Sequence, residues 1–158
     1  REVTFWKGIA LIVQNLGGFL GIYAFSHTTQ RFGRRPTFAL FLLLALLSTA
    51  FVFLSLHQFS EIFWMLPIMG FFQFALFGGY AIYFPELFPV QLRALGASVC
   101  FNGGRIISAV MLPLAGFVKG IEGLSLPAAL TILSTTYLLG LIVIMFLPET
   151  KNQPLPEA

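Results

Sequence analysis

The chain of 158 residues contains no aspartate and has few charged residues of any kind. Only 9% of its residues are charged, whereas about a quarter are charged in an ordinary soluble domain. Its single cysteine, Cys100, excludes a disulfide framework and a metal site built from several cysteines of this chain. The sequence also shows no nucleophile grouped with a base, and it shows no cluster of metal ligands. We therefore expect a protein that is not an enzyme and uses no cofactor.

Apolar residues dominate the rest of the sequence, with 58% hydrophobic residues and a mean hydropathy of +0.89. Because a helix needs roughly 20 mainly apolar residues to cross a bilayer, we predict an all-α, polytopic transmembrane helix bundle. Its five spans are expected at about 9–29, 37–56, 62–84, 95–118 and 124–147. Residues 1–147 would form one bundle domain, and residues 148–158 a polar cytoplasmic tail.

The basic residues predict the orientation of the bundle. The net charge of +3 does not indicate nucleic-acid binding, because most positive charges lie in the tail and in the loops after the first and third spans. These residues are Arg31, Arg34, Arg35, Arg93 and Lys151. The two opposite loops hold one basic residue, Lys119. By the positive-inside rule we expect the tail in the cytoplasm and the start of the chain outside. The membrane is expected to be the plasma (inner) membrane.

Polar side chains occur at membrane depth in three of the five spans. Because a polar group that faces lipid has no partner, they are expected to face other helices or water. Helical spacing places Asn102 and Arg105 on one face of the fourth span, and Gln73 and Tyr80 on one face of the third. The candidate pathway for a solute consists of Gln14, Asn15, Gln73, Tyr80, Asn102 and Arg105. For any single amide, a simple contact between helices is the alternative.

Arg105 is the most informative of these residues. It lies eleven residues beyond Ala94, or roughly 17 Å along a helix, near the middle of a hydrocarbon core about 30 Å thick. Its guanidinium cannot give up its proton there, so it needs an anion, carbonyl groups or water. Arg105 could bind a carboxylate of a transported molecule. Alternatively, it snorkels toward the cytoplasm or pairs with a helix outside this chain.

Charged residues also gather at the span ends that are expected in the cytoplasm. They are Arg34, Arg35, Glu86, Arg93 and Glu149. We predict that they form ion pairs that tie helix ends together in one conformation and release them in another, as a gate. The alternative is that the arginines only orient the chain in the membrane.

Three short motifs lie at the ends of predicted spans: RFGRRP after the first span, PELFPVQLRALG after the third and PETKN after the fifth. Together they resemble the C-terminal half of a major facilitator superfamily transporter. Their order and spacing are similar to helices eight to twelve of the family's twelve, over essentially the whole chain. GASVCFNGGRI looks most like the branch of metabolite and aromatic-acid symporters, and PETKN also resembles the ending of sugar porters. One residue departs from the family pattern, because Gln30 stands where the first motif usually has an acidic residue.

The resemblance implies a secondary transporter that works by alternating access, as a symporter or a uniporter. The N-terminal half of such a transporter would be missing from this chain. In the family, the two arginine–glutamate motifs form the gate predicted above. The solute is expected to be a small polar organic molecule, and an organic acid is favoured over a sugar. A non-transporting family relative that acts as a receptor or scaffold is a further alternative. Glu61 and Glu86 lie near span ends, so if protons drive transport, we expect the titrating carboxylate outside this chain.

Overall fold

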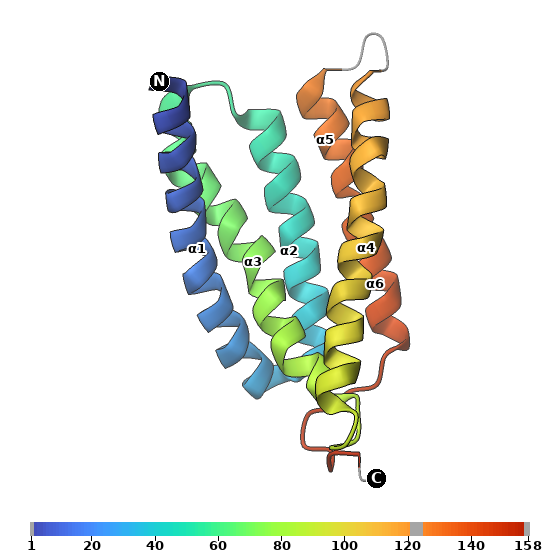
Figure 1. The fold of residues 1–158 in the computed structure, drawn as a ribbon. Helices are drawn as coiled ribbons and strands as arrows, with labels where there is room; N and C mark the ends of the chain where they lie inside the picture. Colours follow the sequence, from blue (N-terminus) through green and yellow to red (C-terminus); the bar gives the residue numbers. More distant parts are fainter. Residues whose placement is uncertain (1, 121–124, 157–158) are drawn as a thin grey trace.

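The computed structural model describes residues 2–120 and 125–156, and every regular element in these ranges is helical. The elements are α1 (Glu2–Phe32), α2 (Arg34–Ser55), the short 3-10 helix η1 (Phe59–Glu61), α3 (Ile62–Glu86), α4 (Arg93–Lys119), α5 (Leu126–Ser134) and α6 (Thr136–Phe146). The long helices run up and down one bundle, in which α6 continues α5 (Figure 1). The prediction of an all-α bundle is confirmed.

Four helical segments are long and apolar enough to cross a membrane: Glu2–Phe32, Arg34–Ser55, Phe59–Glu86 and Leu126–Phe146. They correspond to the first, second, third and fifth predicted spans. Helix α4 has 27 residues and is about 40 Å long, which is enough to cross a bilayer. Among the described residues, α4 is not one of these four segments. It carries the polar residues Asn102 and Arg105. A membrane span at 95–118 therefore stays a prediction.

Four described segments at helix ends lie at two opposite ends of the bundle. The α1–α2 link, the α3–α4 link and the segment after α6 lie together at the lower end in Figure 1, which we call the tail end. The link from α2 to η1 lies at the upper end. This grouping matches the arginine pattern, because Arg34, Arg93 and Lys151 share the tail end. Which side of the membrane the tail end faces stays a prediction.

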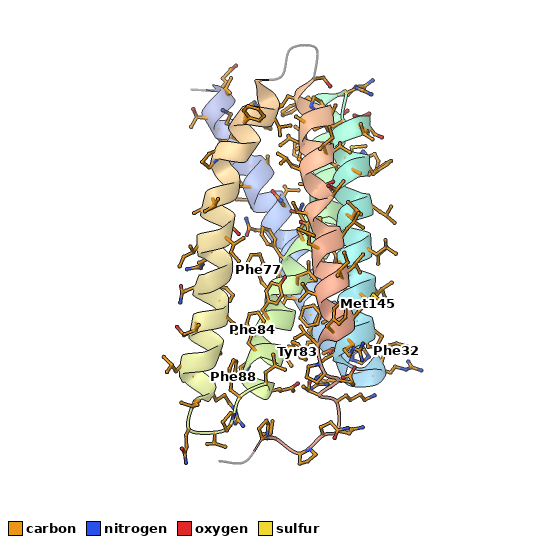
Figure 2. The ribbon with its side chains drawn as sticks, turned by 90° about the vertical axis from the view of Figure 1, so that its right-hand side faces the viewer. Phe32, Phe77, Tyr83, Phe84, Phe88 and Met145 are labelled. Carbon is orange, nitrogen blue, oxygen red and sulfur yellow. The ribbon has the colours of Figure 1, made fainter. Side chains whose placement is uncertain are left out.

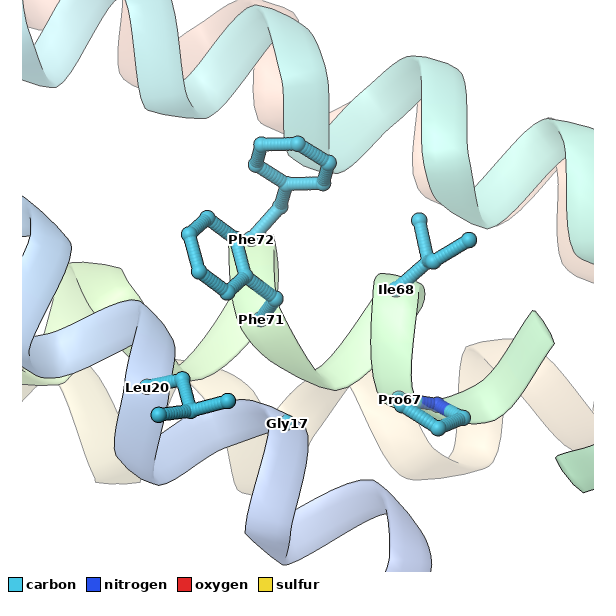
Figure 3. A pocket seen from close by; sticks show the side chains of 6 residues that line it. All are labelled: Gly17, Leu20, Pro67, Ile68, Phe71 and Phe72. Atoms are coloured by element: carbon cyan, nitrogen blue, oxygen red, sulfur yellow. The ribbon is translucent and has the colours of Figure 1, made fainter. Parts of the chain in front are cut away.

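Helices α1 and α3 pack closely because glycines let their backbones approach. A Cβ atom at Gly21 would lie 1.9 Å from the carbonyl oxygen of Phe71, so a larger residue does not fit there. Beside this contact lies a shallow apolar groove of about 280 Å³, lined by Gly17, Leu20, Pro67, Ile68, Phe71 and Phe72 (Figure 3). Gly17, Gly18 and Gly21 of α1 thus serve helix packing.

The main apolar core joins α1, α2, α3 and α6. Its buried residues are Phe25, Phe38, Phe41, Leu42, Ala45, Ala75, Leu76, Tyr83 and Ile144. Phe25 packs edge-on against Phe38 with 4.9 Å between the ring centroids, an arrangement that aromatic rings favour. Since Phe38, Tyr83 and Ile144 come from the ends of their helices, this core holds the tail end of the bundle together.

The span predicted at 124–147 is interrupted at Thr135, which separates α5 from α6; residue 124 itself lies outside the described residues. The interruption coincides with a run of hydroxyl side chains. Ser134, Thr135 and Thr136 each donate a hydrogen bond to the carbonyl group three residues earlier. These bonds compete with the backbone hydrogen bonds of a continuous helix. Apolar periodicity alone did not reveal this break.

Candidate functional site

A cavity of about 650 Å³ lies among α2, α3, α4 and α6. This volume is typical of sites that hold small organic molecules. Aromatic side chains form much of its wall: Phe38, Phe74, Phe77, Tyr80, Tyr83, Phe84, Phe101 and Tyr137. Besides the tyrosine hydroxyls, its polar lining comes from Gln73, Cys100, Arg105 and Ser108. The cavity therefore combines flat apolar surfaces with a single positive charge.

Helix α3 supplies one wall of the cavity. Gln73, Phe77, Tyr80 and Phe84 are spaced four, three and four residues apart, so they share one helix face. Figure 2 shows Phe77 and Phe84 on the side of α3 that faces α4. The Tyr80 ring stacks on Phe84 with 5.1 Å between centroids, and on Phe38 of α2 with 5.6 Å. These two contacts fix the orientation of Tyr80.

Helix α4 supplies the opposite wall, with Cys100, Phe101, Gly104, Arg105 and Ser108. The guanidinium carbon of Arg105 lies 4.9 Å from the centroid of the Phe101 ring, a distance typical of a cation–π contact. Among the described residues, Arg105 makes no ion pair. An anion that enters the cavity would therefore meet a positive charge supported by an aromatic ring.

Three of the six predicted pathway residues line this cavity: Gln73, Tyr80 and Arg105. Gln14 lies one layer behind the wall, because its side-chain amide on α1 donates to the Gln73 carbonyl oxygen over 3.5 Å. Gln73 in turn donates to the Thr49 hydroxyl of α2 over 2.9 Å. Gln14 and Thr49 thus orient the amide of Gln73, and α1, which does not line the cavity, contributes to the site through Gln14.

The other two predicted pathway residues, Asn15 and Asn102, do not line the cavity. Each is exposed and donates to a carbonyl group one turn earlier on its own helix, Asn15 to Leu11 over 2.7 Å and Asn102 to Ser98 over 2.9 Å. Asn102 was expected beside Arg105, but at 3.6 residues per turn it lies about 60° from Arg105 on the side opposite to Phe101 and Ser108, which line the cavity. This offset turns Asn102 away from the cavity while Arg105 lines it.

The cavity also contains residues that the sequence did not single out. Phe101 and Ser108 lie four residues before and three residues after Arg105, so helical spacing from that arginine could have found them. Tyr137 is the single tyrosine of the last predicted span and could have been selected on that basis. Phe38 gave no such signal, since an apolar residue in an apolar span is equally typical of lipid contact.

At the tail end, Arg34 and Glu86 form an ion pair between the start of α2 and the end of α3. The Nη2 atom of Arg34 lies 2.6 Å from Glu86 Oε1, and its Nε atom lies 3.0 Å from Oε2. The Nη1 atom also donates to the Thr29 carbonyl oxygen of α1 over 3.3 Å. One guanidinium therefore connects three helices.

Glu149 contacts backbone groups instead of the arginine side chain that the sequence predicted as its partner. Its carboxylate accepts hydrogen bonds from the N–H groups of Arg34 at 2.8 Å, Arg35 at 3.0 Å and Lys151 at 2.9 Å. It thereby caps the start of α2, where N–H groups lack helical partners. Gly33 permits this approach: its φ is +105°, and a Cβ atom there would lie 2.9 Å from Glu149 Oε2.

The environment of Glu149 favours its charged form. Burial raises the pKa of its carboxyl group, but the hydrogen bonds from the backbone N–H groups of Arg34, Lys151 and Arg35 lower it, and the nearby Arg34 charge acts in the same direction. The net result is a pKa below the ordinary value. Glu149 is therefore a charged cap at neutral pH.

Arg35 and Arg93 differ from the prediction in the same way, because they bind carbonyl groups and make no ion pair among the described residues. Arg35 donates to the carbonyl oxygens of Ile144 at 3.3 Å and Met145 at 2.6 Å, near the end of α6. Arg93 donates to the carbonyl oxygen of Pro85 at 3.0 Å. Carbonyl groups in the last turn of a helix lack helical partners, so they compete with carboxylates for arginine.

The segment after α6 adds contacts that the sequence did not predict. The Tyr83 hydroxyl donates to the Pro148 carbonyl oxygen, and the Thr150 hydroxyl donates to Glu86. The Lys151 amine donates to the Arg31 carbonyl oxygen at the end of α1 over 2.6 Å. Residues 148–151 therefore connect α1, α2 and α3 at the tail end.

Comparison with known proteins gives relatives that are named as transporters, while no family model matches the chain. The chain is 30% identical over 94% of its length to a provisionally named metabolite transport protein of Haemophilus influenzae. It is 27% identical over 91% of its length to a protein of Cupriavidus pinatubonensis provisionally named as a 4-methylmuconolactone transporter. It is also 35% identical over 79% of its length to solute carrier family 22 member 12 of Homo sapiens.

The chain spans only about a third of these relatives or less: 36% of the Haemophilus protein, 33% of the Cupriavidus protein and 22% of the human protein. The similarity nevertheless covers more than nine tenths of this chain for the two bacterial relatives. The resemblance seen in the three sequence motifs is therefore confirmed by relatives from bacteria and an animal.

Proposed function

We propose that this chain, which belongs to the major facilitator superfamily, forms the C-terminal half-bundle of a secondary transporter. It would correspond to helices eight to twelve of that family. The observation that carries the proposal is the cavity of about 650 Å³ with Arg105 and Gln73 in its wall. A cavity of this size favours a carrier over a receptor or scaffold, whose interior side chains could fill the same space. The transporter would work by alternating access, together with an N-terminal half-bundle.

The solute we propose is a small organic acid. The planar guanidinium of Arg105 suits a carboxylate, and the aromatic wall suits the carbon skeleton of the same molecule. A sugar would need hydrogen bonds for hydroxyl groups all round its ring. The cavity offers one amide, Gln73, together with scattered hydroxyls, so it suits a sugar less well.

The tail end is proposed to be the cytoplasmic gate in a plasma-membrane carrier. The ion pair of Arg34 with Glu86 and the cap that Glu149 forms on α2 support this proposal, because both join the ends of different helices. Coupling to protons, if the carrier is a symporter, is assigned to a carboxylate outside this chain, since Glu61 and Glu86 lie at the ends of the third span.

Reconstitution of the full-length carrier in liposomes tests the proposal. Radiolabelled benzoate should show saturable uptake that other small carboxylates compete for, and labelled glucose should show little uptake at the same concentration. Saturable uptake of glucose without benzoate would favour the sugar alternative. Failure of a panel of acids and sugars to enter, with correctly inserted protein, would favour the receptor or scaffold.

A further inference from the structure

Tyr83 is the side chain that joins the cavity to the tail end. It is 1% exposed, lines the cavity, and packs against Phe38 with 5.6 Å between ring centroids. Its hydroxyl donates to the Pro148 carbonyl oxygen, in the segment that follows α6. Figure 2 shows Tyr83 in the lower part of the bundle, close to the segment that follows α6. One side chain is therefore part of both regions.

Pro148 directly precedes the two residues that act at the tail end. Glu149 caps α2, and Thr150 donates to Glu86, which lies three residues beyond Tyr83 on α3. The end of α3 therefore holds this short segment on both sides of Glu149, through Tyr83 before it and Glu86 after it. Glu149 therefore contacts α2 from a segment whose two neighbouring residues, Pro148 and Thr150, both bind the end of α3.

We propose that Tyr83 is a positioning residue for the gate: its hydrogen bond to Pro148 keeps Glu149 on the start of α2 and makes closure of the tail end depend on the cavity floor. The proposal rests on the proposed transport function. A shift of the Tyr83 ring at the cavity would break the bond and leave the Pro148 carbonyl oxygen without its donor, a loss typically costly in a buried position. The cap on α2 would then loosen.

The test is Tyr83→Phe in the full-length carrier, which keeps the ring in the core and removes only the hydroxyl. The first measurement is hydrogen–deuterium exchange at the backbone amides of Arg34, Arg35 and Lys151, which donate to Glu149. Loss of one hydrogen bond should raise their exchange rates by roughly twofold to tenfold. The rest of α2 should exchange as in the unmodified carrier.

The second measurement uses Cys100, the one cysteine of this chain, which lines the cavity. A membrane-impermeant maleimide is applied from the tail side, and modification is read by the mass of the peptide that contains Cys100. If the tail end closes less tightly, Tyr83→Phe should increase the labelling rate by a similar factor. A purely structural tyrosine would lower abundance or the melting temperature without making Cys100 reachable from one side.

Two further variants complete the design. Tyr23→Phe is the control: it removes the hydroxyl of a tyrosine on α1 whose surface is 73% exposed, and it should change neither measurement. Thr150→Val releases the other side of the segment from Glu86 without altering the cavity wall, and it should raise both rates. It also keeps the proposal testable if Tyr83→Phe fails to fold.

The proposal is overturned if well-folded Tyr83→Phe shows unchanged exchange at the three amides. It is equally overturned if either Tyr83→Phe or Thr150→Val speeds exchange without speeding the labelling of Cys100. Neither measurement uses a transported solute. A carrier that rejects both benzoate and glucose would thus count against the proposed function while leaving the result for Tyr83 readable.

Discussion

Arg34 and Glu86 lie 52 residues apart in the sequence and meet through two hydrogen bonds, of 2.6 and 3.0 Å. Their side chains are only 16% and 19% exposed, so water screens the pair weakly. The pair is geometrically specific, because two N–H groups of one planar guanidinium bind the two oxygens of one carboxylate. Because both side chains are largely buried, removal of one leaves the charge of the other without its ion-pair partner.

Replacement of Glu86 by glutamine should therefore slow transport while leaving inserted protein in the membrane. The variant loses the ion pair and weakens the contact with Thr150, so the state in which the tail end is closed becomes less stable. Initial uptake rates, normalised to the amount of folded carrier, measure the effect. An unchanged rate would show that the pair does not take part in the transport cycle.

A double-mutant cycle separates the pair from general effects of charge. The combination of Glu86→Gln with Arg34→Gln should cost less stability than the sum of the two single changes, with a coupling of roughly 0.5–3 kcal/mol. The matched control pairs Glu86→Gln with Arg31→Gln, since Arg31 is an exposed residue at the end of α1. Additive costs in both cycles would mean that the arginines only orient the chain.

Glu149 should make the tail end sensitive to acid. Its pKa lies below the ordinary value in the folded state, so its contribution to stability is complete above the ordinary pKa and is lost as the pH falls through the folded pKa. Melting temperatures measured from neutral to acidic pH should fall more steeply for the unmodified carrier than for Glu149→Gln. At neutral pH, Glu149→Gln should already be the less stable protein. Parallel pH profiles of the two would contradict the capping role.

The close contact of α1 with α3 predicts a strong effect of a single methyl group. Gly21→Ala should lower the melting temperature, since its Cβ would lie 1.9 Å from the Phe71 carbonyl oxygen and force the helices apart. Overpacking of this kind typically costs about 1–3 kcal/mol. Gly8→Ala is the matched control on the same helix, because a Cβ there meets nothing within 4 Å. Equal stability of the two variants would show that α1 and α3 adjust freely.

The sequence predicted the bundle better than it predicted the contacts at its ends. Long apolar runs are sufficient to indicate helices, because a backbone inside a membrane must satisfy its own hydrogen bonds. The arginines and carboxylates that the sequence grouped lie together at the tail end. Their backbone partners were not predicted, since N–H and carbonyl groups are present at every helix end and leave no mark in a sequence. Glu149 and Arg35 both bind such groups.

The cavity shows a similar limit. Arg105, Gln73 and Tyr80 could be selected because a polar group at membrane depth is costly. Asn102 satisfied the same criterion, but its amide donates to a carbonyl group of its own helix and does not line the cavity. Polarity therefore indicates which residues need a partner, while the rotation of each helix decides where the partner is found.

The topology remains to be tested by labelling from each side of the membrane. Cysteines placed at Gln58 and Gln91, which lie at opposite ends of the bundle, should react with an impermeant reagent from opposite sides. The cysteine at Gln91 should be reached from the cytoplasm, as the arginines of the tail end predict. Both positions are exposed, so a failure to label would not be due to burial. Labelling from the same side would contradict the order of the spans.

Arg105 separates the candidate functions most directly, because a binding role and a structural role predict different results for the same variants. If it binds a carboxylate, Arg105→Lys should weaken benzoate binding by losing the planar fork, and Arg105→Gln should nearly abolish it at normal protein yield. If it only supports the bundle through the contact with Phe101, Arg105→Gln should lower yield or melting temperature while surviving molecules bind as before. Binding of glucose through Gln73 should not respond to either variant. Measured affinities for benzoate and glucose, compared at equal amounts of folded protein, therefore decide whether this charge belongs to the solute site.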